Sequence, residues 1–386
     1  MKTIQLQTQE TVPLLCAVSL QSNIRNSLVR FLKQQIDANH DSSHRLFQSN
    51  ISSVQDILCD LKNLKDVVTF ICKKNQFNFP TISIHSNDLE HWLEQESNHV
   101  VVYGDAHYPA ALANIADPPL VLFARGVIDV INKPCLAIVG SRQASEQSNE
   151  LANTFSKSYA QEGWVVVSGL AKGVDANAHS GALCYGYTIA VVGHGLDIVY
   201  PKSNYTLSEK IATQGLLVSE YPLHTPPLPH HFPIRNRIIA GLSSVVVVIE
   251  AGVKSGSLIT ARLAQNESRE VFAVPGSIHT DRHAGCHQLI RNHYAGLITK
   301  PSDIYDTISV PKDIVRKNII PPSLDANILI SDLAKELYVA IPSVTFTDLQ
   351  LQLTTKLQTD KILAGLIELE CAGLITKSLD GDYKKI

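Results

Sequence analysis

The chain has 386 residues, of which 45% are hydrophobic and 18% are charged, and its formal net charge at pH 7 is -3. This length suffices for two or three domains, and the composition excludes an intrinsically disordered protein. The small negative charge also excludes a protein that binds nucleic acid through a basic surface spread over the whole molecule.

Cysteine usage and hydropathy indicate the compartment. The seven cysteines are scattered and contain no CxxC pair, which indicates a reducing environment rather than a disulfide framework. The first ten residues lack the pattern of a signal peptide, and no apolar run approaches the roughly 18 residues of a membrane span. We therefore expect a cytoplasmic protein.

Residues 1–95 are predicted to form a small helical domain. Apolar spacing predicts helices at residues 12–20, 24–38, 54–61 and 64–73. The first glycine of the chain is Gly104, so this segment lacks the glycine-bearing hairpin of helix-hairpin-helix proteins. We assign it no contact with DNA.

A bridge at residues 100–126, with two short predicted strands, follows the helical domain. After it come six short apolar segments, each of which ends in a turn rich in Gly, Ser and basic residues. They span residues 135–142, 164–173, 188–197, 216–222, 244–257 and 271–276. Each is typical of a buried strand, and segments of helical pattern lie between them. This alternation predicts an α/β fold, a doubly wound parallel sheet with helices on both faces, whose ligands bind beyond the carboxyl ends of the strands.

The last part of the chain has a different pattern. Paired prolines indicate a linker at residues 306–324, and residues 325–386 predict helices at 331–340, 347–353 and 359–371, followed by a hairpin at Asp380-Gly381. This order predicts a winged-helix-like domain. Glu368 and Glu370 interrupt the basic stripe expected of a strong DNA reader, so a contact between protein chains is the favoured role.

Three turns of the predicted sheet could hold anions. They lie in residues 135–300, the only segment of the chain with a positive net charge, which has 13 basic and 11 acidic side chains. Each combines small residues with a helix start, where amide groups favour phosphate. For the turn at Gly140-Ser141-Arg142, a glycine required by the turn and an arginine in a surface ion pair are the alternative interpretation. The candidate residues are Gly140, Ser141 and Arg142, then Gly169 and Lys172, then Ser255, Gly256, Ser257 and Thr260.

The densest basic cluster is the FPIRNR segment, which contains Phe232, Arg235, Asn236 and Arg237. An aromatic ring beside two arginines is the combination that stacks bases and holds the backbone of a single strand. A core phenylalanine on a basic helix face explains the same residues. Lys202, in the YPK segment, could reach the same edge of the sheet.

Two catalytic or metal hypotheses are also open. Asp175 and His179 are one helical turn apart and could form an acid-base pair, but an N-terminal carboxylate and a histidine packed on the sheet are the favoured interpretation, because no nucleophile lies beside them. Histidines between residues 279 and 293, with Cys286, could bind zinc, but no second cysteine pair supports such a site, and no metal is predicted. The glycines match neither GxGxxG nor the P-loop, so no cofactor is predicted.

Seven segments occur in an order and spacing that resemble the DNA-processing protein A (DprA, or Smf) family. They are IVGSR, VVSGLAKGVDANAH, IAVVGHGLDIVYP, LLVSEYP, FPIRNRIIAGLS, SGSLITA and VFAVPG. The resemblance covers residues 96–305 and extends more loosely over the C-terminal tail. It implies a SAM-like helical domain at 1–95 and an extended Rossmann domain at 96–305.

The resemblance also implies a function. Members of this family are non-catalytic homodimers that bind and protect single-stranded DNA during natural transformation and recombination and help to load the RecA recombinase. By motif, Arg142 and Lys202 are implied to hold DNA phosphates. Phe232, Arg235, Asn236 and Arg237 are implied to border a pocket that accepts a base.

Two other functions remain as alternatives. A nucleotide-cleaving hydrolase of related fold would use Arg142 for phosphate and Glu220 or Glu250 as a base, but the PGGxGT signature of phosphoribohydrolases is missing from this sequence. A scaffold protein with a vestigial site in the sheet is the second alternative.

Overall fold

The computed structural model describes residues 11–38, 61–75, 78, 86–105, 107–308, 331–341, 358–371, 374–377 and 383–385. The chain divides into two compact units, Met1–Val315 and Arg316–Ile386. Among the residues in these ranges, no helix is both long and apolar enough to cross a bilayer.

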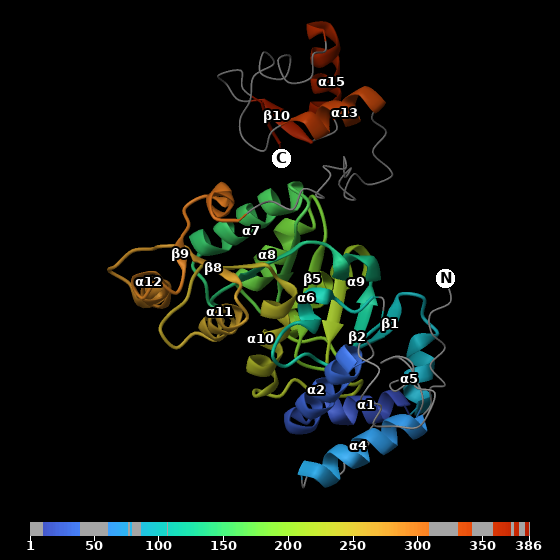
Figure 1. Ribbon diagram of the computed structural model, residues 1–386. Coiled ribbons are helices and arrows are strands. Elements are labelled where there is room, and N and C mark those ends of the chain that lie inside the picture. The colour runs from blue at the N-terminus through green and yellow to red at the C-terminus, as the bar shows by residue number, and fades with distance from the viewer. Residues whose placement is uncertain are drawn as a thin grey trace. The chain divides into compact units, whose positions relative to one another are not determined.

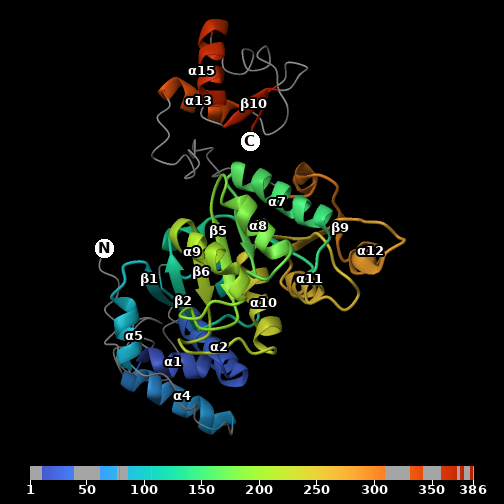
Figure 2. The same cartoon turned by 180° about the vertical axis from the view of Figure 1, so that it is seen from behind.

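A nine-stranded sheet forms the centre of the first unit (Figures 1 and 2). Its strand order is β1-β2-β6-β5-β4-β3-β7-β8-β9, with parallel pairing from β6 to β9 and antiparallel pairing of β1 with β2 and of β2 with β6. The strands are β1 Asn98–Val102, β2 Val121–Gly126, β3 Cys135–Val139, β4 Val165–Ser168, β5 Thr188–Val192, β6 Leu216–Ser219, β7 Val245–Val248, β8 Glu270–Ala273 and β9 Gly296–Leu297. All six predicted core strands are confirmed.

Helices cover both faces of this sheet, which confirms the doubly wound α/β class. Alternate residues of β3 show how: Leu136 and Ile138 join a core with α7 and α8, whereas Ala137 and Val139 join a core with α10 and α11. These strands are apolar on both faces because both faces are covered. The α-helices of this unit that follow β1 are α6 Ala110–Ala113, α7 Glu146–Gln161, α8 Val174–Ala182, α9 Tyr205–Gln214, α10 His231–Leu242, α11 Ser257–Asn266 and α12 Ala284–Arg291.

The strand order reverses at β3. The chain runs from β3 through β4 and β5 to β6 in one direction, then returns to place β7 on the other side of β3. At such a switch point the loops after the two strands diverge and leave a crevice beyond their carboxyl ends. The ends of β3 and β7 are therefore where a ligand site is expected.

Four described helices precede the sheet: α1 Thr11–Ser19, α2 Ser22–Ala38, α4 Leu61–Asn75 and α5 Ser86–Leu93. Three of them confirm predicted helices, α5 was not predicted, and the helix predicted at 54–61 lies almost wholly outside the described residues. Leu14, Leu28 and Val68 belong to the same hydrophobic core as Phe123 of β2. The core is thus continuous from these helices into the sheet, and the division at residue 95 remains a prediction.

The second unit is described at α13 Asp332–Ala340, α15 Thr359–Cys371, β10 Ile375–Lys377 and β11 Tyr383–Lys385. The two strands pair antiparallel, with Ile375 opposite Lys385. Leu337, Leu366 and Ile375 contribute to their own small core. The helix predicted at 347–353, the turn at 380–381 and the linker beyond residue 308 lie outside the described residues, so the winged helix remains a prediction.

Candidate nucleic-acid interface

A pocket of about 760 Å³ lies at the switch point, between the ends of β3 and β7 and the first turns of α10 and α11. Its position agrees with the rule for doubly wound sheets. Ten of the fourteen predicted site residues line it: Gly140, Ser141, Arg142, Phe232, Arg235, Asn236, Ser255, Gly256, Ser257 and Thr260.

The turn after β3 supplies an arginine side chain to the pocket. Gly140 is required because a Cβ atom there would lie 2.6 Å from Val174 Cγ2. The amide of Ser141 donates to the carbonyl of Glu250 (2.8 Å), and the amide of Gln143 donates to Ser141 Oγ (3.1 Å). These two amides are therefore not free for an anion, contrary to the prediction. The exposed side chain of Arg142 remains as the anion-binding group of this turn.

Two aromatic rings stand at the same pocket. The guanidinium carbon of Arg142 lies 5.3 Å from the ring centre of Phe232, and the rings of Phe232 and Tyr200 are 5.7 Å apart. Tyr200 is 42% exposed, so its ring is accessible to a ligand. The sequence interpretation missed Tyr200, although it stands directly before the Pro201-Lys202 pair that was noted.

Arg235 forms the floor of the pocket together with Asp175. The Arg235 side chain is only 4% exposed, and its Nη1 donates to the carbonyls of Gly169 (3.0 Å) and Val191. Asp175 Oδ2 accepts from the amides of Gly169 (3.1 Å) and Ala171 (3.4 Å). Asp175 was considered as a catalytic acid but not as a lining residue of this pocket.

Burial shifts both ionisable groups of the floor. Desolvation lowers the pKa of Arg235 to about 10, although the nearby Asp175 carboxylate opposes the shift, so the guanidinium stays charged at neutral pH. Desolvation raises the pKa of Asp175, and Arg235 opposes that shift in turn. The floor thus combines a buried guanidinium with a buried carboxyl group.

The start of α11 forms the opposite wall. The hydroxyls of Ser255 and Ser257 lie 2.6 Å apart, and Asn236 Nδ2 donates to the carbonyl of Gly256 (3.4 Å). Gly256 is exposed, with open space where a Cβ atom would stand. Lys254, which was not predicted, adds an exposed cation to this wall. An N-terminal helix end with hydroxyls and a lysine favours an anionic ligand.

Four predicted site residues do not line the pocket. Lys172 and Lys202 are exposed on neighbouring turns, and Gly169 lies beneath the floor, where a Cβ atom would be 2.6 Å from Arg235 Nη2. Arg237 is buried, and its Nη2 donates to both carboxylate oxygens of Glu220 at 2.7 Å. Two successive residues of an α-helix rotate the side-chain direction by about 200° around the helix axis, so Arg235 and Arg237 lie on nearly opposite sides of α10 and do not reach the same pocket. The predicted role of Arg237 is corrected accordingly.

Glu220 and Glu250, the carboxylates considered as catalytic bases, both accept hydrogen bonds from other side chains of the fold. Glu220 receives hydrogen bonds from Arg25 (3.1 Å) and from Arg237. Glu250 accepts from the amide and hydroxyl of Ser145, the residue that caps α7, at 3.0 and 2.8 Å. Burial opposes ionisation of Glu250, but these hydrogen bonds outweigh it and lower its pKa.

Asp175 and His179 do not form the acid-base pair that was considered, and their contacts agree with the favoured structural interpretation. His179 is fully buried, with Nδ1 2.6 Å from Thr188 Oγ1, while its Nε2 accepts from the Leu170 amide (3.3 Å). Burial lowers the pKa of His179 to about 3, so the ring is neutral and structural. Within the part of the chain that the structure describes, no three His, Cys, Asp or Glu side chains are grouped to hold a metal ion.

This fold and pocket define a class: a Rossmann-like α/β protein whose switch-point pocket is lined by aromatic and cationic side chains. The family model of DNA recombination-mediator protein A matches residues 99–309, more than half of the chain. The chain belongs to this family.

Individual relatives cover the same region. The chain is 42% identical to Protein Smf of Escherichia coli over 60% of this chain and 62% of that protein. It is 47% identical to DNA processing protein DprA of Streptococcus pneumoniae over 52% of this chain and 71% of that protein. The match to the Escherichia coli protein thus spans less than two thirds of its length.

Two solved structures resemble the fold. The X-ray structure of DprA from Streptococcus pneumoniae superposes with a TM-score of 0.59 and 34% identity, covering 77% of this chain and 97% of that one. DNA processing protein A from Helicobacter pylori, whose structure concerns its single-stranded DNA binding mode, gives a TM-score of 0.50 and 32% identity, covering 54% of this chain and 94% of that one.

Proposed function

We propose that this protein binds single-stranded DNA at the switch-point pocket. One base stacks against the rings of Phe232 and Tyr200, while phosphates on either side meet Arg142 and the Lys254 to Ser257 turn. The single observation that carries this proposal is the Arg142 guanidinium 5.3 Å from the Phe232 ring at an open pocket. An aromatic platform beside a cation is the arrangement by which proteins hold single strands without sequence preference.

The wider role follows from the family. We infer that the protein acts in the cytoplasm on single strands taken up in transformation, protects them, and helps to load RecA onto them as a homodimer. Lys172 and Lys202, exposed beside the pocket, are proposed to hold phosphates of neighbouring nucleotides. The function is binding rather than hydrolysis, which is supported by the occupation of Glu220 and Glu250 by structural partners.

The test is direct binding by the full chain. Fluorescence anisotropy with a labelled oligothymidylate is expected to show saturable binding that weakens with salt, with a log-log slope of about -0.7 for each phosphate neutralised. A parallel incubation with nucleoside monophosphates should release no free base above the background rate. Absence of binding at low salt would refute the proposal, and rapid base release would favour the hydrolase.

A further inference from the structure

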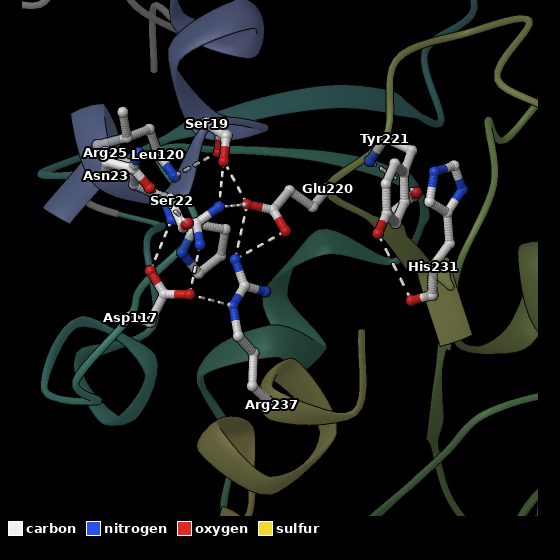
Figure 3. Close-up of polar contacts among 12 residues, drawn as sticks. Ser19, Ser22, Asn23, Arg25, Asp117, Leu120, Glu220, Tyr221, His231 and Arg237 are labelled. Carbon is white, nitrogen blue, oxygen red and sulfur yellow. Dashed lines mark hydrogen bonds and ion pairs between the residues drawn. The ribbon is translucent and has the colours of Figure 1, made fainter. Parts of the chain in front are cut away.

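Four charged side chains from distant parts of the sequence form a network of ion pairs in which three members are buried and Asp117 is partly exposed (Figure 3). We call Arg25, Asp117, Glu220 and Arg237 the arginine-carboxylate network. Arg25 donates to Asp117 Oδ1 (2.7 Å) and to Glu220 Oε1 (3.1 Å). Arg237 donates to Asp117 Oδ2 (3.1 Å) and to both oxygens of Glu220. Each carboxylate is thus shared by both arginines.

The network is neutral and closely packed. The side chains of Arg25 and Glu220 are 4% and 2% exposed. Ser19 adds a hydroxyl that donates to Glu220 Oε1 (2.9 Å) and accepts from the Leu120 amide (3.0 Å). Buried charges of this kind are retained only with well-placed partners, because removing one partner leaves another uncompensated. The geometry of the network is therefore strongly specified.

The network connects the N-terminal helices with α10, the helix that carries the pocket. Arg25 is on α2, and Glu220 directly follows β6. On α10, Phe232, Arg235 and Asn236 line the pocket, whereas Arg237 points to the network. One side of α10 therefore lines the pocket, and the other side contacts the network.

The first turn of α10 depends on these contacts for its position. No side chain caps its N-terminus, and the segment before it is rich in proline, which cannot donate backbone hydrogen bonds. Tyr221, beside Glu220, stacks on His231 with ring centres 4.0 Å apart (Figure 3). The Glu220-Tyr221 segment thus holds α10 at its first residue and again at Arg237.

We propose that Arg25 is a positioning residue for the single-stranded DNA site: through Glu220 and Arg237, the N-terminal helices set the placement of α10 and hence of Phe232 and Arg235. This inference rests on the proposed function, which it deepens by giving the N-terminal helices a part in it. The coupling is reciprocal, so DNA bound at the pocket strengthens the attachment of α1 and α2 to the sheet.

The test compares the oligothymidylate affinity of full-length variants whose substitutions lie on the same helix, α2. Arg25→Ala removes the link, and Arg30→Ala is the matched control, because Arg30 is exposed on α2. We expect Arg25→Ala to weaken oligothymidylate binding about fivefold with an unchanged salt slope, since Arg25 contacts no phosphate. Arg25→Lys keeps the positive charge but lacks the several hydrogen-bond donors of the guanidinium, so its loss of affinity should be smaller. This variant also provides a test if Arg25→Ala does not fold.

Hydrogen exchange of the free protein gives a readout that does not need DNA. In Arg25→Ala the amides of the first half of α10 should exchange faster, while those of α7, on the far face, keep the wild-type rate. Unchanged α10 exchange, or an affinity within twofold of wild type in a variant with lowered thermal stability, would overturn the inference. Absence of DNA binding by the wild-type protein would instead refute the proposed function, and the exchange result would still decide whether Arg25 positions α10.

Discussion

Arg235 and Arg237 lie two residues apart on α10, and both guanidinium groups are buried on different sides of the helix. Arg235 donates to the carbonyl groups of Gly169 and Val191 at the floor of the pocket. Arg237 binds Glu220 and Asp117 beside the N-terminal helices. The basic cluster of the FPIRNR segment is thus divided between the pocket, which Arg235 lines, and a structural network, which contains Arg237.

The glycine beneath the pocket floor gives the first prediction. A Cβ atom at Gly169 would lie 2.6 Å from Arg235 Nη2 and 2.7 Å from Asp175 Oδ2, so Gly169→Ala must displace the floor. We expect a loss of about 1–3 kcal/mol in the free energy of unfolding, together with weaker DNA binding. Gly256→Ala is the control, because open space surrounds that position. Equal urea midpoints for the two variants would contradict the account of the floor.

The aromatic platform gives the second prediction. Phe232→Ala should weaken oligothymidylate binding by about 1–3 kcal/mol, the usual contribution of one stacked base, whereas Phe232→Tyr should retain most of the affinity. Tyr205→Ala serves as the control, since Tyr205 is 59% exposed and does not line the pocket. If the Tyr205 and Phe232 truncations weaken binding equally in anisotropy titrations, the platform is elsewhere.

The buried histidine beneath β4 and β5 gives a pH prediction. Burial lowers the pKa of His179 from 6.5 to about 3 in the folded protein, so the unfolded chain binds the additional proton below pH 6.5. The contribution of His179 to the free energy of unfolding is therefore fully present above pH 6.5, and it falls by about 1.4 kcal/mol per pH unit as the pH decreases towards 3. His194 and His231, whose pKa values burial also lowers, act in the same direction.

Urea unfolding at pH 7.5 and pH 5 measures this effect. The wild-type protein should lose about 2 kcal/mol between these conditions from His179 alone. The difference should shrink by that amount in His179→Gln, whatever the absolute stability of the variant. An equally steep pH dependence in the two proteins would show that His179 does not remain neutral in the fold.

The sheet and the pocket edge could be predicted from the sequence for a physical reason. Strands such as 245–248, with four consecutive valines, are β-branched and apolar on both faces, which is typical of a covered parallel strand. Turns that follow parallel strands meet at one edge of the sheet, so Arg142 and Ser255 could be expected at the same site. The structure confirms that they line one pocket.

The errors also have physical causes. Arg237 was assigned to the DNA site because neighbours in sequence were treated as neighbours in space, although the helical repeat separates it from Arg235. The Ser141 amide was expected to be free, but it pairs with the Glu250 carbonyl of the adjacent β7 segment. The arginine-carboxylate network has no local signal, since its members come from four segments joined only by the tertiary fold.

The salt dependence of oligothymidylate affinity, measured for the wild-type protein and Arg142→Ala, tests the central claim most directly. Lys210→Ala is the control, because Lys210 is exposed on α9 and does not line the pocket. Loss of one phosphate contact should weaken binding to all sequences alike and make the log-log slope shallower by about 0.7, while the control keeps the wild-type slope. An Arg142→Ala variant with wild-type affinity and slope would contradict DNA binding at this pocket.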